Sequence, residues 1–287
     1  MTSGLITKGV GGEYTVVAGS EVYICTARGV FRNRQETPHV GDHVMIDVNK
    51  RAICEIKPRT NMLTRPPVAN IGQVIVTMAA REPAFHPGLL DRFLVLAAHE
   101  NIPAVICINK YDLHTGPDVY RPYTDAGYPV VKVSAATGQG LAQLKEHMAG
   151  KLNVFAGPSG AGKSSLINAL IPGATMETGH ISARLKRGKH TTRHAEILPM
   201  GTGFCVDTPG FSSLETDKIP PEAFAELFLE FVPFLGQCKF KDCMHDKETG
   251  CAVKEQVGGV IHPGRYESYL AFVHGATGPV YKGKKGK

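Results

Sequence analysis

The sequence predicts a multidomain α/β protein in which an all-β barrel and a helical C-terminal unit flank a central doubly wound α/β unit. Short β-type runs punctuated by glycine fill the first 70 residues. Apolar runs then alternate with helical periodicity as far as residue 210, and a cluster of cysteines follows Pro220 and Pro221. We therefore expect three domains, at residues 1–68, 69–217 and 218–287.

The composition is that of a soluble globular protein. The 287 residues are 43% hydrophobic and 20% charged, which excludes a disordered chain or a fibre, and the formal net charge is +6. No apolar run approaches the roughly 18 residues that a membrane-spanning helix needs. The first ten residues also lack the pattern of a secretory signal. We expect a cytoplasmic monomer with no membrane partner.

The individual elements follow from these patterns. Barrel strands are expected at 13–18, 21–26, 43–48 and 52–56, because turn residues separate these runs. Buried parallel strands are expected at 71–78, 104–108, 130–133, 152–155 and 204–206. Helices are expected between them at 87–100, 140–148 and 163–170, and in the C-terminal unit at 222–231 and around 266–273.

The most specific motif follows the strand at 152–155 and opens the helix at 163–170. A glycine, four residues and then Gly-Lys-Ser is typical of a phosphate-binding P-loop. Its backbone N–H groups and the helix N-terminus favour a phosphate, Lys163 is expected to reach the β- and γ-phosphates, and Ser164 to ligate Mg²⁺. The predicted nucleotide-binding residues are Gly157, Pro158, Ser159, Gly160, Ala161, Gly162, Lys163, Ser164 and Ser165.

A second motif, an Asn-Lys-x-Asp loop after the strand at 104–108, indicates the base. The Asp112 carboxylate can accept hydrogen bonds from N1–H and the 2-amino group of guanine, whereas adenine would leave the charge unpaired. The sequence therefore predicts GTP and GDP rather than ATP. The predicted base-binding residues are Asn109, Lys110, Tyr111, Asp112, Ser134 and Ala135.

A third set of residues completes the predicted nucleotide site. Asp207 follows the strand at 204–206 and is expected in the Mg²⁺ shell, and Gly210 offers an N–H to the γ-phosphate. A threonine between the P-loop and this acid should close over Mg²⁺, and we favour Thr192 over its neighbour Thr191.

The order of the motifs predicts a circularly permuted P-loop GTPase. An ordinary GTPase runs from the P-loop to the switch threonine, Asp-x-x-Gly, Asn-Lys-x-Asp and Ser-Ala, whereas here the last two come first. Permutation is tolerated because each loop keeps its place at the strand ends. It also connects the 207–210 loop to the C-terminal unit, so we expect hydrolysis to move that unit directly.

The cysteine cluster predicts a metal site. Cys238, Cys243, His245 and Cys251 supply a complete Cys₃His set for one structural Zn²⁺. Disulfides are the alternative, which a cytoplasmic chain disfavours.

Taken together, these features resemble the circularly permuted GTPases of small-ribosomal-subunit biogenesis, the RsgA (YjeQ/YloQ) family. The resemblance is carried by the barrel, the permuted order, the P-loop at 157–165, Lys-His-Thr-Thr-Arg at 189–193 and the Cys/His spacing at 238–251. It implies an OB-fold, a GTPase and a zinc-binding domain that dock on the small ribosomal subunit and its rRNA late in maturation. It also implies that the subunit stimulates GTP hydrolysis, and we expect hydrolysis to promote release.

The residue that orients the attacking water is less specified. Phe211 stands where many GTPases carry a water-orienting glutamine, so we expect slow intrinsic hydrolysis. His190 is our catalytic candidate beside Thr192 and Lys163, although a solvated loop histidine is an equally open interpretation. Candidate rRNA phosphate contacts are Arg184, Lys186, Arg187, Lys189 and Arg193 in this loop and Arg28, Arg32, Arg34, Arg51, Lys57 and Arg59 in the barrel.

Two other functions compete with this one on the sequence, and only the first stays open. In one, the protein is a nucleotide-gated rRNA-binding module in which GTP switches affinity and hydrolysis is incidental. The other, a metabolic P-loop kinase, lacks support because it leaves the Asn-Lys-x-Asp loop without a purpose.

Overall fold

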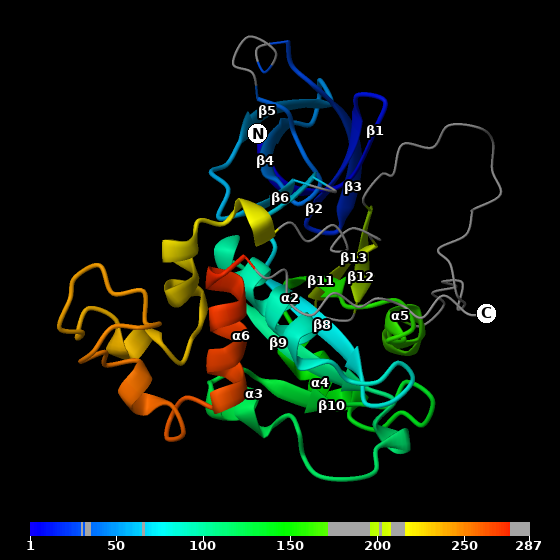
Figure 1. Ribbon diagram of the computed structural model, residues 1–287. Helices are drawn as coiled ribbons and strands as arrows, with labels where there is room; N and C mark the ends of the chain where they lie inside the picture. The colour runs from blue at the N-terminus through cyan, green and yellow to red at the C-terminus, as the bar shows by residue number, and fades with distance from the viewer. Residues whose placement is uncertain are drawn as a thin grey trace, which may run out of the picture.

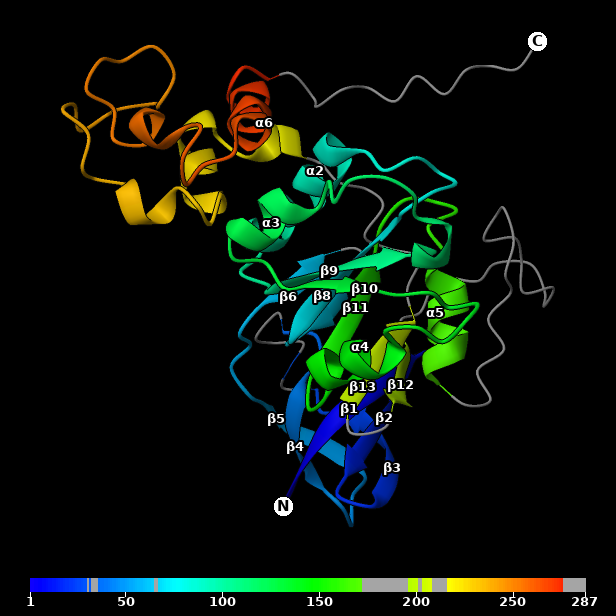
Figure 2. The same cartoon turned by 90° about the horizontal axis from the view of Figure 1, so that it is seen from below.

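The computed structural model of the protein describes residues 1–29, 31, 36–64, 67–171, 196–200, 203–207 and 216–275. A barrel, a central sheet covered by helices and a C-terminal unit follow one another along the chain (Figure 1). The barrel and the C-terminal unit lie on different sides of the central sheet, as the second view confirms (Figure 2).

Five strands form the N-terminal barrel: β1 (Thr2–Val10), β2 (Glu13–Ala18), β3 (Glu21–Ala27), β4 (His43–Asp47) and β5 (Ala52–Ile56). β1 pairs with both β2 and β4, and β3 pairs with β5 in parallel, so the order β1-β2-β3-β5-β4 closes on itself. This arrangement is the expected OB-fold. β1 was not predicted, because Thr2, Ser3 and two glycines obscure its alternation.

A two-stranded hairpin joins the barrel to the central sheet. It comprises β6 (Met62–Thr64) and β7 (Pro67–Ala69). Asn61 donates from Nδ2 to the carbonyl of Ile71 at 2.9 Å and accepts from the N–H of the same residue at 2.8 Å. These two hydrogen bonds fix the entry of the chain into the sheet.

The central sheet has six strands: β8 (Gln73–Ala79), β9 (Ala104–Asn109), β10 (Val130–Lys132), β11 (Leu152–Ala156), β12 (Glu196–Met200) and β13 (Gly203–Asp207). Their order is β10-β9-β8-β11-β13-β12, and only the β12–β13 pair is antiparallel. At the edge, Glu196 of β12 pairs with Lys8 of β1, so that barrel and sheet form one continuous set of strands. All predicted strands are present within two residues of their predicted ends.

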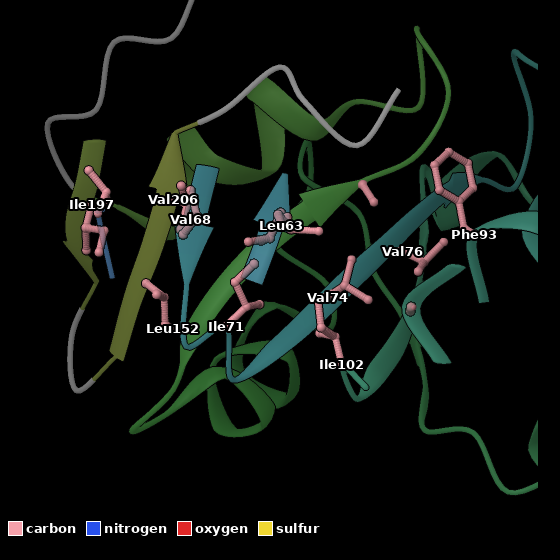
Figure 3. Close-up of a cluster of buried hydrophobic side chains, with 14 of the residues drawn as sticks. Leu63, Val68, Ile71, Val74, Val76, Phe93, Ile102, Leu152, Ile197 and Val206 are labelled. Atoms are coloured by element: carbon pink, nitrogen blue, oxygen red, sulfur yellow. The ribbon is translucent and has the colours of Figure 1, made fainter. Parts of the chain in front are cut away.

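Helices cover both faces of this sheet: α2 (Pro87–His99), α3 (Arg121–Asp125), α4 (Leu141–Met148) and α5 (Lys163–Leu170). The side chains of β8 alternate between two buried clusters, since Val74 and Val76 pack with Phe93 of α2, and Ile75 packs with Leu144 of α4. The first cluster continues through Leu63 and Val68 of the hairpin (Figure 3). It also includes Ile6 and Ile46 of the barrel. α2 and α3 therefore lie on one face, and α4 and α5 on the other (Figure 2).

The C-terminal unit consists of 3₁₀ turns and one α-helix: η2 (Thr216–Lys218), η3 (Pro221–Leu227), η4 (Val232–Phe234), η5 (Lys254–Gln256) and α6 (Pro263–Val273). The predicted helix at 222–231 is a shorter 3₁₀ helix, because Phe228 turns extended and buries its ring against Phe231 and Tyr269. No helix of the described residues is long and apolar enough to cross a membrane.

Candidate nucleotide site and metal centre

The P-loop joins β11 to α5 through glycines in the left-handed region. At Gly157 (φ +136°) a Cβ atom would lie 2.0 Å from the carbonyl oxygen of Thr77. At Gly162 (φ +87°) it would lie 2.3 Å from Nδ2 of Asn109. Any other residue would collide with the ends of β8 and β9, so the glycines are required for the loop to pass there.

Lys163 begins α5 and folds back over the loop. Its Nζ donates hydrogen bonds to the carbonyls of Gly157 (2.7 Å) and Pro158 (2.9 Å). Burial lowers the pKa of Lys163. A half-buried ammonium group at the N-terminus of a helix is suited to binding phosphate.

Asn109 connects the three predicted nucleotide loops. The side chain is 1% exposed, and its Nδ2 donates to the carbonyls of Ala161 (2.9 Å) and Gly162 (3.4 Å). Its Oδ1 accepts from the N–H of Ala135 at 3.2 Å. One amide therefore holds the P-loop, the Asn-Lys-x-Asp loop and the Ser-Ala loop together. Sequence reasoning did not assign this bridging role, because its partners lie 52 and 26 residues away.

The rest of the Asn-Lys-x-Asp loop presents its acid outward. Lys110 adopts a left-handed conformation (φ 56°) and its Nζ donates to the carbonyl of Glu82. The N–H of Tyr111 donates to the carbonyl of Val133 at 2.9 Å, and Asp112 is exposed. The fully buried Ser134 accepts at Oγ from the N–H of residue 137. Because Asp112 is exposed, an external donor can reach its carboxylate.

The remaining predicted residues divide into two groups. Ser164 and Ser165 lie half-buried in the first turn of α5, and Ser159 and Gly160 are exposed. Asp207 ends β13, whose register with β11 brings it beside the strand that enters the P-loop. Outside the described residues lie Gly210, His190, Thr191, Thr192, Phe211, Arg184, Lys186, Arg187, Lys189 and Arg193.

The four predicted metal ligands converge. Their donor atoms all lie within 4.8 Å of one another. Nδ1 of His245 is 3.5 Å from Sγ of Cys238 and 3.3 Å from Sγ of Cys251, and these two sulfurs are 3.9 Å apart. Zn–S and Zn–N bonds of about 2.3 and 2.0 Å give tetrahedral edges close to these distances. The set fits one tetrahedral ion such as zinc.

The surroundings of this Cys₃His cluster support a cation. Burial is the main cause that raises the pKa of Cys243 to about 12, and it also raises the pKa of Cys251. Crowded thiols in such a place lose their protons only when a positive charge compensates them. Tyr266 and Tyr269 of α6 donate from their hydroxyls to the carbonyls of His245 and residue 244, both at 2.8 Å. The helix and the cluster therefore hold each other.

The basic barrel residues predicted for rRNA contact differ in whether their side chains are already paired within the barrel. Arg59 donates from Nε and Nη2 to the fully buried carboxylate of Asp42, at 2.7 and 2.8 Å, and so serves the barrel itself. Lys57 pairs with Glu55 at 3.0 Å. Arg51 is exposed. Nη2 of Arg28 lies 3.9 Å from the carboxylate of Asp47. Arg32 and Arg34 lie outside the described residues.

The sheet order and the loops that Asn109 joins define the class of this protein. The strand that carries the P-loop follows the strands that carry the other two loops, which is the arrangement of a circularly permuted P-loop GTPase. The RsgA GTPase family model matches residues 56–217, and the RsgA N-terminal domain model matches residues 3–54. The chain belongs to the RsgA GTPase family.

Known relatives span nearly the whole chain. The small ribosomal subunit biogenesis GTPase RsgA of Alkaliphilus metalliredigens is 45% identical over 283 residues, which cover 95% of this chain and 97% of that protein. The crystal structure of YjeQ from Thermotoga maritima superposes with a TM-score of 0.82 at 36% identity, covering 96% of this chain and 99% of the other. YloQ, described as a circularly permuted GTPase, gives 0.83 at 36% identity and covers 96% and 95%.

Proposed function

We propose that this protein is a GTPase that binds the small ribosomal subunit, assists its late maturation, and leaves it when GTP is hydrolysed. The observation that carries the proposal is the Asn109 side chain, which holds a phosphate loop and a base loop in one rigid unit. The names of the relatives support the small subunit as the partner. We place the domain boundaries after residues 68 and 217, so that the barrel and the C-terminal unit flank the GTPase.

Phosphate release from GTP and from ATP, with and without purified small subunits, tests this function. We expect slow release from GTP alone, a large stimulation by subunits, and no comparable release from ATP. A variant that binds GTP without hydrolysing it would distinguish the proposed function from the alternative, a nucleotide-gated rRNA-binding module. If such a variant still completes subunit maturation, even while leaving the subunit slowly, hydrolysis is incidental.

Within this function, the P-loop would hold the phosphates of GTP or GDP. Ser164, Thr192 and Asp207 would hold Mg²⁺, which supplies charge neutralisation at the β- and γ-phosphates. Cys238, Cys243, His245 and Cys251 would hold one structural Zn²⁺. The chain would act as a cytoplasmic monomer whose barrel and basic loop contact rRNA.

Substitution of Asp112 by asparagine should change the base preference. The amide loses the acceptor for one of the two guanine donors, so GTP should bind at least ~100-fold more weakly. The new N–H can donate to the 2-oxo group of xanthine, so XTP should bind the variant more tightly than GTP does. Titration calorimetry with GTP and XTP measures both. An unchanged order of affinities would contradict the assignment of Asp112.

His190→Ala should reduce subunit-stimulated hydrolysis about 100-fold while GTP affinity stays within twofold. The reason is that His190 would orient the water only in the docked complex. Single-turnover hydrolysis with saturating small subunits measures this effect. Full stimulated turnover in the variant would make His190 a solvated loop residue.

A further inference from the structure

A buried charge cluster joins the C-terminal unit to the GTPase. Arg265, in the first turn of α6, is 3% exposed and lies between two buried carboxylates. Its Nε and Nη2 donate to the carboxylate of Glu230 at 2.6 and 3.1 Å. Its Nη1 donates to the carboxylate of Asp91. All the donor nitrogens therefore point at acids from two different parts of the chain.

The cluster is closed to solvent. Asp91 is 1% exposed and Glu230 is 5% exposed. The guanidinium carbon of Arg265 also lies 4.6 Å from the ring centre of Phe228 and 5.3 Å from that of Tyr123. Burial opposes the charge, but the two carboxylates raise the pKa of Arg265 above its ordinary value, so the guanidinium stays protonated. Removing the arginine would leave two buried acids without a counter-charge.

The members of the cluster come from three helices and from the segment 228–230 of the C-terminal unit. Asp91 belongs to α2 and Tyr123 to α3, whereas Arg265 belongs to α6. In both views α6 lies beside α2 (Figures 1 and 2). Val95 of α2 also packs into the aromatic core of the C-terminal unit. The unit is therefore held by helices on the face of the sheet, and not only by its chain connection after β13.

Such a cluster permits one relative position of its parts. A rotation or slide of the C-terminal unit would break charge-assisted hydrogen bonds in a site that water does not enter. Intermediate positions are therefore unfavourable. α2 itself packs on β8 through Phe93. This anchor lies far in the sequence from the 207–215 segment, which connects β13 to the C-terminal unit.

We infer that Arg265 clamps the C-terminal unit to α2 and α3 in every nucleotide state, so that the GTPase and the Cys₃His cluster meet the small subunit as one preformed surface. The subunit part of this inference rests on the proposed function. The inference departs from the expectation that hydrolysis moves the C-terminal unit through the 207–210 loop. In this arrangement, nucleotide-dependent changes are confined to the loops around the phosphates.

Amide hydrogen exchange of the full, metal-loaded chain tests the clamp without any ribosome. In the wild type we expect the protection of α2 and α6 to be the same with GDP and with a non-hydrolysable GTP analogue. Arg265→Met should speed exchange in α6 and in the facing half of α2 by at least tenfold, and Arg265→Lys should give a smaller acceleration because an ammonium lacks the fork geometry. Arg121→Met is the matched control, since that arginine is 80% exposed and its ion pair with Asp125 lies at the surface.

Two results would overturn the clamp. One is a change in wild-type α6 protection between the two nucleotides, a measurement that does not depend on any variant folding. The other is amide exchange at the wild-type rate in both Arg265 variants.

A final assay concerns the small ribosomal subunit. Intrinsic GTP hydrolysis should stay unchanged in Arg265→Lys, while the stimulation of hydrolysis at limiting subunit concentration falls at least fivefold. If the wild type itself shows no stimulation, the proposed function fails, whereas the exchange results still decide the clamp.

Discussion

Replacing Lys163 with alanine is expected to lower kcat/KM for GTP by about 10²–10³-fold. The Nζ of Lys163 lies against the carbonyls of Gly157 and Pro158, where the loop encloses it from one side. A phosphate that enters the loop can bind this ammonium. The stabilisation by the ammonium increases as negative charge develops on the phosphate during transfer. Phosphate release measured over a range of GTP concentrations gives the loss.

A matched control separates this effect from a general loss of positive charge. Lys145 lies exposed on α4, so Lys145→Ala should hydrolyse GTP at the wild-type rate. The thermal midpoint of Lys163→Ala should stay close to that of the wild type, because within the part of the chain that the structure describes the ammonium bonds to the carbonyls of Gly157 and Pro158. Wild-type turnover in Lys163→Ala would show that the loop does not bind the reacting phosphates.

Substitution of Cys251 by serine is expected to abolish metal binding and to unfold the C-terminal unit. Cys251 is 2% exposed, and its Sγ lies 3.3 Å from Nδ1 of His245, so the substitution removes one of the four converging donor atoms. Binding of structural zinc contributes on the order of 10–16 kcal/mol in small zinc-finger peptides, which is more than most domains have in total stability. Native mass spectrometry should find one zinc ion in the wild type and none in the variant.

A second cysteine provides a control variant for this prediction, and hydrogen exchange in α6 provides a second measurement. Cys54 lies in the barrel, outside the Cys₃His cluster, and Cys54→Ser should keep the full zinc content. Hydrogen exchange in α6 should accelerate in Cys251→Ser, because Tyr266 and Tyr269 lose the carbonyls that fix their hydroxyls. A wild-type chain purified without chelator that carries no metal would contradict the assignment outright.

Much of the fold could be predicted because its signals are local. The buried strand at 152–156 is followed by a glycine-rich turn and a helix, and the structure confirms each of the three. The four donor atoms at 238–251 converge as the spacing of the residues suggested. The 3₁₀ helix Pro221–Leu227 was expected to be a longer helix, because its helical periodicity hides the tertiary packing of Phe228.

The contacts that could not be predicted are those between residues far apart in the chain. Asn109 was predicted to bind the base, and among the described residues its side chain also joins the P-loop to the Ser-Ala loop, a role that no local pattern indicates. The pairing of Arg265 with Asp91 spans 174 residues and has no motif. A signal did exist, since Asp91 is a lone acid among Leu90 and Phe93 on the apolar face of its helix, where an isolated charge requires a partner.

The bridge between β1 and β12 gives the barrel a second task. β12 is the outermost strand of the central sheet. Without β1 beside it, its edge would expose backbone N–H and C=O groups to pairing with another protein molecule. By occupying that side through Lys8 and Glu196, the barrel shields the enzyme from edge-to-edge association. A GTPase trimmed of its first strands should consequently be prone to precipitation, however well its catalytic loops are preserved.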